Sequence, residues 1–145
     1  MIYLGADKHG FKTLEAVFDY LKSHNLNYEN LGIETNSEDI ELEVLIPRVV
    51  KEVLKNTENR GILTCGTGVG VEVGANKFSG IRACLAVNEK VAGWSREFDD
   101  CNILCLPGWD MNKERISKIL DAWFKTKYDG NPDRLKMFRV FNSWH

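Results

Sequence analysis

Short apolar segments alternate along this chain with longer segments of helical period, and this alternation constrains the fold more than any other feature. The runs Met1–Gly5, Gly61–Cys65 and Asn102–Leu106 have the length and composition of buried strands. Between residues 10 and 24, apolar side chains recur at the i, i+3, i+4 and i+7 spacing of one helix face. The chain is therefore expected to mix strands and helices throughout.

Applied to the whole chain, these patterns predict five strands and six helices. The expected strands are Met1–Gly5, Tyr28–Ile33, Gly61–Cys65, Ile81–Val87 and Asn102–Leu106, and the expected helices are Gly10–His24, Leu42–Leu54, Val71–Phe78, Glu89–Phe98, Ile116–Phe124 and Arg134–Phe141. Helical crossovers between strands produce a parallel sheet covered on both faces. The sequence predicts an α/β fold, a three-layer Rossmann-like sandwich with a five-stranded parallel sheet, formed by residues 1–145 as one domain.

Charge and hydropathy exclude several classes of protein. Nineteen basic and 21 acidic residues give a net charge of −2, which provides no broad cationic surface for nucleic acid. No apolar run approaches the roughly 20 residues that cross a bilayer, so no membrane partner is expected. The first apolar run ends at Asp7 and Lys8, so it is too short for the apolar region of a signal peptide. The four cysteines do not show the spacing pattern of a secreted disulfide scaffold. These features favour a cytoplasmic protein.

The most informative motif is Cys65-Gly66-Thr67-Gly68-Val69-Gly70, which lies between an expected strand and an expected helix. In such sheets, ligands bind beyond the carboxyl ends of the strands. Alternate glycines allow a tight turn with exposed N–H groups, and a helix start favours the thiolate form of a cysteine. Cys65 is thus a candidate base or nucleophile, while a buried cysteine capping a strand fits the spacing equally well.

Three other motifs are excluded by single positions. A dinucleotide fingerprint needs a glycine where Val71 stands, and a Walker loop needs a Gly-Lys-Ser/Thr ending. A cysteine-dependent phosphatase would need an arginine six residues after Cys65, again at Val71. The loop therefore matches none of these phosphate-binding motifs.

Asp7, Lys8 and His9 follow the first expected strand and so share the same edge of the sheet. Asp7 is the best candidate for a functional carboxylate, and it suits a helix N-cap equally well. Lys8 and His9 could face a phosphate or solvent.

Other polar residues allow a functional and a simpler interpretation. Asp99 and Asp100 could bind a polyol or cap a loop, and Arg134, Lys136 and Arg139 could bind phosphate or form a solvated helix face. The tryptophans, Trp109 among them, are expected in the core or at an interface. The histidines and cysteines show no zinc-ligand spacing, so no metal site is expected.

The chain resembles the family of ribose-5-phosphate isomerase B and the galactose-6-phosphate isomerase subunits. The resemblance runs nearly end to end and is carried by the following segments: Gly5-Ala6-Asp7, Arg60–Gly70, Ala75-Asn76-Lys77, Gly80-Ile81-Arg82-Ala83, Ser95-Arg96-Glu97, Asp100-Cys101-Asn102 and Tyr128-Asp129-Gly130. It implies aldose–ketose interconversion of a sugar phosphate without metal or organic cofactor.

By this resemblance, Cys65 is the base that moves a proton between C2 and C1 through a cis-enediolate. The Thr67 hydroxyl and the N–H groups of Gly66, Gly68, Val69 and Gly70 would stabilise the oxyanion. Asp7 would hold sugar hydroxyls, and Asn76 would shape the loop or contact substrate.

The resemblance also implies that the C-terminal arginines, here Arg134 and Arg139, hold the phosphate in a cleft completed by a second subunit. A homodimer is then the minimum unit, tetramers being also known in the family. The helical tail at about 131–145 is expected to pack on the partner subunit.

Two residues near the expected sugar-binding position differ from the family pattern. Lys8 replaces a histidine, with His9 one position later, and Phe98 replaces the histidine that opens the furanose ring. Because phenylalanine transfers no proton, Asp99 or His9 would open the ring, or the substrate is open-chain. We therefore expect a substrate other than ribose 5-phosphate. The alternatives are an isomerase of an unphosphorylated sugar, and a non-catalytic or paired subunit that binds a sugar phosphate.

Overall fold

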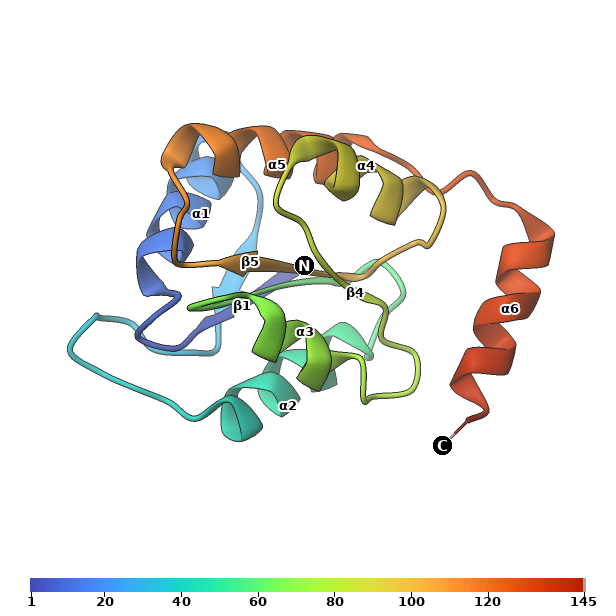
Figure 1. The fold of residues 1–145 in the computed structure, drawn as a ribbon, viewed down its shortest axis with the longest axis horizontal. Coiled ribbons are helices and arrows are strands. Elements are labelled where there is room, and N and C mark those ends of the chain that lie inside the picture. Colours follow the sequence, from blue (N-terminus) through green and yellow to red (C-terminus); the bar gives the residue numbers. More distant parts are fainter. Residues whose placement is uncertain (145) are drawn as a thin grey trace.

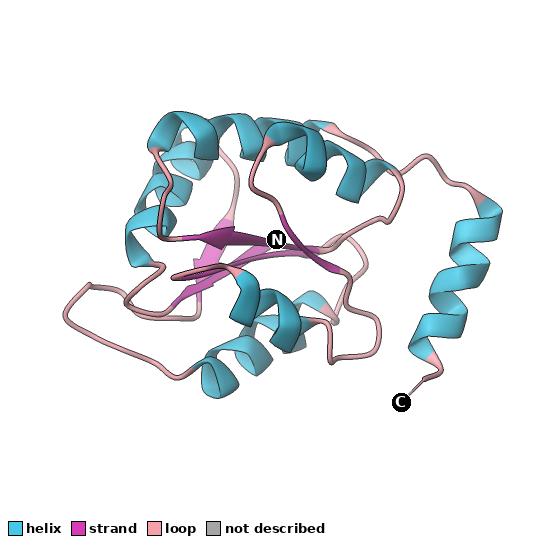
Figure 2. Cartoon of the chain, in the orientation of Figure 1, coloured by secondary structure: helices cyan, strands magenta, loops and turns pink. Residues whose placement is uncertain are grey.

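The computed structural model describes residues 1–144 and shows five strands and six helices (Figures 1 and 2). The strands are β1 (Ile2–Ala6), β2 (Tyr28–Asn30), β3 (Arg60–Cys65), β4 (Ala83–Leu85) and β5 (Ile103–Pro107), and the helices are α1 (Phe11–Ser23), α2 (Leu42–Val53), α3 (Val69–Ala75), α4 (Glu89–Glu97), α5 (Lys113–Lys125) and α6 (Pro132–Asn142). No helix within residues 1–144 is long and apolar enough to cross a membrane.

The strands form one parallel sheet in the order β2-β1-β3-β5-β4, which confirms the expected Rossmann-like α/β fold. The register pairs Ala6 with Thr64 and Cys65 with Pro107. The carboxyl ends of β1, β3 and β5 therefore meet at one edge of the sheet, where their loops can build a shared site.

Two apolar layers cover the sheet. Helices α1, α4 and α5 lie over one face, and α2 and α3 lie over the other (Figure 1). Successive residues of a strand point to opposite faces, so Ile62 packs with the α1–α5 layer and Leu63 with the α2–α3 layer. By this alternation, the side chain of Cys65 also belongs to the α2–α3 layer.

Some element boundaries differ from those expected. Strand β2 stops at Asn30 rather than Ile33, because the Asn30 amide donates to the Ile33 carbonyl and Gly32 packs directly on the Ala6 backbone. Helix α3 starts at Val69, directly after the turn at Gly68. Helix α6 stands away from the sheet at one end of the molecule (Figure 1).

Candidate active site

The loops at the carboxyl edge touch one another through backbone. A Cβ added to Gly10 would lie 2.4 Å from the carbonyl carbon of Thr64, and one added to Gly108 would lie 1.9 Å from the His9 oxygen. The Gly108 N–H donates to the Cys65 carbonyl at 2.7 Å. These contacts fix the segments after β1, β3 and β5 relative to one another.

The loop after β3 presents free N–H groups. The carbonyls of Cys65 and Gly66 accept hydrogen bonds from the segment after β5, and Gly68 has a φ of 76°, which favours glycine. Within residues 1–144, the N–H groups of Gly66, Thr67 and Gly68 donate no hydrogen bond. Such a row of unpaired donors can bind an oxyanion.

Thr67 lies in this loop with an exposed side chain. Its Oγ1 accepts a hydrogen bond of 3.1 Å from the Val69 N–H, which starts α3. The hydroxyl hydrogen is still available to a ligand. Val69 itself is exposed, so the start of α3 is open to solvent.

Cys65 ends β3 with a side chain that is only 5% exposed. Its Sγ lies 3.9 Å from the place where a Cβ on Gly70 would be, so a larger residue at position 70 would cover the thiol. The structure thus shows a buried cysteine beside a tight turn, and in addition it places that thiol beside Gly70, at the far end of the loop that carries the free N–H groups. Both sequence interpretations of Cys65 are compatible with this position.

Asp7 starts the turn that leads into α1. One carboxylate oxygen, Oδ1, accepts a hydrogen bond of 2.9 Å from the Gly10 N–H, as a helix-capping aspartate would. The other oxygen accepts no hydrogen bond within residues 1–144. Asp7 can therefore shape the turn and still offer an acceptor to a ligand.

Lys8 and His9 point to different neighbours. The Lys8 ammonium pairs with Asp39 at 3.1 Å and so ties the loop between β2 and α2 to this edge. This contact lowers the pKa of Asp39, mainly through the hydrogen bond from Lys8. His9 is exposed and stacks edge-to-face on Trp109, with ring centroids 5.6 Å apart.

The position of Trp109 in the site was missed in the sequence, where it was grouped with core or interface tryptophans. The backbone N–H of Trp109 donates to the Gly66 carbonyl at 3.0 Å, and its indole covers Gly66. The signal that would have found it is its place just after β5, because loops that follow neighbouring parallel strands meet at one edge.

Asp99 lies at the amino ends of the strands, whereas Cys65 lies at their carboxyl ends. It precedes β5, whereas Cys65 pairs with Pro107 at the end of β5. Five strand residues separate the two edges by about 13 Å. Within one chain, the structure therefore does not bring Asp99 to Cys65. The carboxylate of Asp99 is exposed and accepts no hydrogen bond within the described part of the chain.

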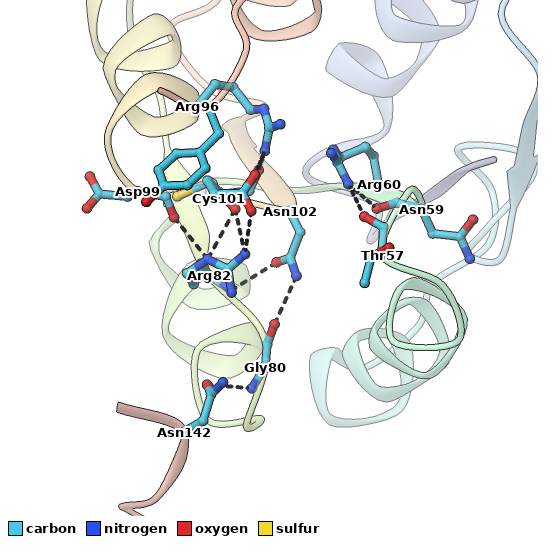
Figure 3. A network of polar contacts seen from close by, with 12 residues as sticks. Thr57, Asn59, Arg60, Gly80, Arg82, Arg96, Asp99, Cys101, Asn102 and Asn142 are labelled. Carbon is cyan, nitrogen blue, oxygen red and sulfur yellow. Dashed lines mark hydrogen bonds and ion pairs between the residues drawn. The ribbon is translucent and has the colours of Figure 1, made fainter. Parts of the chain in front are cut away.

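A network of arginines holds the segment that carries Asp99 (Figure 3). Arg82 Nε donates to the Asp99 carbonyl at 2.9 Å. Arg82 and Arg96 both pair with the carboxylate of Asp100, at 3.1 and 2.9 Å. Asn102 connects the network to the turn before β4 through the Gly80 carbonyl. This segment is rigidly placed.

The arginines of α6 also lie away from Cys65. Arg134 forms an ion pair with Asp129, and its guanidinium lies 5.3 Å above the ring of Phe98. Hydrogen bonds from the Asn131 backbone and from Arg134 lower the pKa of Asp129. Arg139 is exposed and forms no ion pair within residues 1–144.

Asn76 caps α3, and its side-chain amide pairs with the backbone of β4. Its Nδ2 donates to the Ala83 carbonyl and its Oδ1 accepts from the Ala83 N–H, both at 2.9 Å. The structure thus places Asn76 as a support of the edge strand. Among the described residues, no group of three or more potential ligands could hold a metal ion.

A cavity of about 500 Å³ lies between α6 and the body of the molecule. Aromatic residues of α6, among them Phe138 and Phe141, form one wall, and Cys84, Cys101 and Trp94 are on the other. Neither Cys65 nor Asp7 lines it, so this cavity is separate from the carboxyl edge.

Comparisons with known proteins agree with this architecture. The family model described as Ribose/Galactose Isomerase matches residues 2–138. A probable ribose-5-phosphate isomerase B of Mycoplasma genitalium is 30% identical over 96% of this chain and 92% of its own length. The ribose-5-phosphate isomerase B of Escherichia coli is 32% identical over 89% of this chain and 86% of its own.

Solved structures give the same result. A ribose 5-phosphate isomerase from Thermotoga maritima superposes with a TM-score of 0.90 at 31% identity, covering 97% of this chain and 96% of its own. The M. genitalium ribose-5-phosphate isomerase B with bound ribulose-5-phosphate superposes with a TM-score of 0.86 at 31% identity, covering 97% of this chain and 93% of that one. The chain therefore belongs to the ribose/galactose isomerase family.

Proposed function

We propose that this isomerase interconverts an aldose phosphate and a ketose phosphate through a cis-enediolate, with the Cys65 thiolate as base and without a cofactor. The observation that carries the proposal is the β3 loop, where a thiol lies on the same loop as unpaired N–H groups. Proton abstraction next to a carbonyl needs both a base and a group that stabilises the oxyanion. The loop offers both within a few residues.

The proposed reaction assigns one step to each of these groups. Cys65 Sγ takes the proton from C2 of the open-chain aldose, and the electron pair moves through the C1–C2 bond to the carbonyl oxygen. The N–H groups of the loop and the Thr67 hydroxyl stabilise this oxyanion. A proton passes from O2 to O1, and Cys65 returns its proton to C1, which gives the ketose. Asp7 holds a sugar hydroxyl through its free carboxylate oxygen.

A second copy of the chain is proposed to complete the site. Asp99, Arg134 and Arg139 lie away from Cys65 in their own chain, so they reach a substrate over the loop only in a partner. Helix α6 stands apart, and exposed apolar side chains lie on it and just after it, including Phe141 and Trp144. Arg139 is exposed and forms no ion pair within residues 1–144, which leaves its guanidinium available to a phosphate. The tail at 131–145 then packs on the partner subunit, and the minimum unit is a homodimer, in the cytoplasm.

The proposed substrate is a sugar phosphate other than ribose 5-phosphate. The relatives carry the name of ribose-5-phosphate isomerases, and the M. genitalium structure holds ribulose-5-phosphate. In this chain, Phe98 stands where the family has its ring-opening histidine, and its ring lies beneath Arg134. A phenyl ring transfers no proton, so ring opening is left to Asp99 or His9, or is not needed for a short, open-chain substrate.

The first experiment follows isomerisation by NMR in deuterated water. Purified protein is incubated with aldose and ketose phosphates of four to six carbons, ribose 5-phosphate included, and with the unphosphorylated sugars. We expect deuterium exchange at C1 or C2 of one phosphorylated sugar, and loss of this exchange in Cys65→Ala. Exchange that survives in Cys65→Ala contradicts the cysteine base, and rapid turnover of ribose 5-phosphate contradicts the proposed substrate.

Subunit mixing tests the shared site directly. Cys65→Ala and Arg134→Ala are each expected to be inactive. Mixed after subunit exchange, they form heterodimers with one intact site, so roughly a quarter of the wild-type activity should return. No recovery in mass-verified heterodimers contradicts a site built from two chains.

A further inference from the structure

The indole of Trp109 is 56% exposed although it stands on the proposed oxyanion loop. Three of its ring atoms, Cζ2, Cε2 and Cη2, lie within 2.9 Å of the place where a Cβ on Gly66 would be. The backbone N–H of Trp109 also donates to the Gly66 carbonyl. Glycine at position 66 thus lets a large aromatic ring lie directly on the loop backbone.

The thiol and the indole lie on opposite sides of the same backbone. Cys65 belongs to the α2–α3 layer. Gly66 is the next residue, and its missing Cβ is directed at Trp109 instead. Gly66, the first residue with an unpaired N–H, is in contact with the indole, and the loop runs from it to Gly70 beside the thiol. A molecule bound over the free N–H groups of this loop therefore has the thiol on one side and the indole on the other.

His9 fixes the orientation of the indole. The two rings meet edge-to-face, at an angle of 71°, a geometry that aromatic pairs prefer. Ligand sites are commonly walled by aromatic side chains that a few polar groups complement. The exposed indole beside unpaired N–H groups has this composition.

We propose that Trp109 contacts the substrate, packing its exposed indole face against the C–H groups of the sugar chain on the side opposite Cys65. His9 and Trp109 then form the wall that limits how long a sugar chain can be bound. The identity of the ligand rests on the proposed function, whereas the place of contact rests on the geometry of Gly66 and His9.

Tryptophan fluorescence tests the contact without requiring turnover. The ligands are phosphorylated sugar alcohols of four to six carbons, which have no carbonyl and cannot isomerise. We expect one of them to change the fluorescence of the wild type, of Cys65→Ala and of Trp94→Phe. Trp94 is a matched control, because it is 54% exposed and lines the cavity beside α6. The change should disappear in Trp109→Phe, whose melting temperature verifies its fold.

Kinetics provide the second readout. Trp109→Ala should raise KM by about tenfold, which corresponds to about 1.4 kcal/mol, while kcat stays within about threefold, because the lost contact is with a part of the sugar that does not react. The same variant should accept longer sugars relative to the wild type, since the wall is removed.

The outcomes separate this inference from the proposed function. Suppose that the protein is an isomerase, that KM is unchanged in Trp109→Ala and that the ligand response is unchanged in Trp109→Phe. This result overturns the contact alone. A ligand response that depends on Trp109, in a protein without isomerase activity, supports the contact and overturns the proposed function. Isomerase activity without any fluorescence response in the wild type also overturns the contact alone, and absence of both exchange and response overturns both.

Discussion

Replacing Asp100 should destabilise the protein more than any ordinary surface substitution, because this carboxylate lies among three guanidinium groups. Arg96, whose side chain is 8% exposed, and Arg82, at 23%, both pair with it. Arg60 is close enough that the charge of Arg96 contributes to lowering its pKa, after burial. Removing the carboxylate leaves these positive charges near one another without compensation.

The magnitude follows from burial and backbone conformation. Removing one partner of a buried pair costs about 3–5 kcal/mol, and Asp100 is partly exposed, so the lower end, about 3 kcal/mol, applies. Its φ of 44° is left-handed, which costs alanine about 1 kcal/mol more. Asp100→Ala should therefore lose about 4 kcal/mol, which corresponds to roughly 12 °C in Tm for a domain of this size.

Urea unfolding followed by tryptophan fluorescence measures the loss, with Asp100→Asn and Asp100→Gly as controls. Asparagine tolerates the left-handed backbone and tests the charge alone, and glycine should be about 1 kcal/mol more stable than alanine because it relieves the backbone. A loss under about 1 kcal/mol in Asp100→Ala, or a glycine variant weaker than the alanine variant, would refute the reasoning.

Three further predictions concern other parts of the chain. Gly10→Ala should cost at least about 3 kcal/mol by thermal melting, because its Cβ would lie 2.4 Å from the backbone of β3, which cannot move aside; a melt like that of the wild type would contradict the close contact. Cys84 should react with iodoacetamide at lower pH than Cys101, because a hydrogen bond from the Cys101 thiol lowers the pKa of Cys84 whereas the same contact and burial raise that of Cys101; peptide mapping that finds Cys101 labelled first would reverse this assignment. The Tyr20 hydroxyl lowers the pKa of Asp121, so this stabilisation is present above about pH 4 and is lost as the pH falls through the lowered value. In Asp121→Asn, the free energy of unfolding should accordingly fall less steeply as the pH is lowered below about 4. A pH dependence identical to that of the wild type would exclude a contribution of Asp121 to stability.

The sheet and the site loop could be predicted from sequence because their signals are local. Apolar runs and a glycine-rich turn after β3 depend on neighbouring residues only, and the structure confirms both. The position of Asp99 relative to Cys65 depends instead on strand direction: β5 carries the chain from one edge to the other, so residues before and after it separate.

Contacts between segments that are distant in the sequence could not be predicted from local sequence patterns. The partner of Lys8 is Asp39, 31 positions away, and nothing in the spacing of either residue indicates it. Trp109 looks like any interface tryptophan until its closeness to Gly66 is known. Asn76 belongs to a segment that the family shares, but its side-chain amide supports β4. Only the hydrogen bonds with Ala83 show this role.

The three glycines at the carboxyl edge also limit how this enzyme can diverge. Gly10 and Gly108 each touch the backbone of another segment where a Cβ would stand, whereas Gly66 touches the ring of Trp109. A mutation at Gly10 or Gly108 therefore disturbs the scaffold before it can alter selectivity, and one at Gly66 displaces the indole. On the proposed function, change in substrate range enters through side chains that project from this frame, such as His9 and Trp109. A lineage could exchange these two residues repeatedly while the reacting edge beneath them stayed the same.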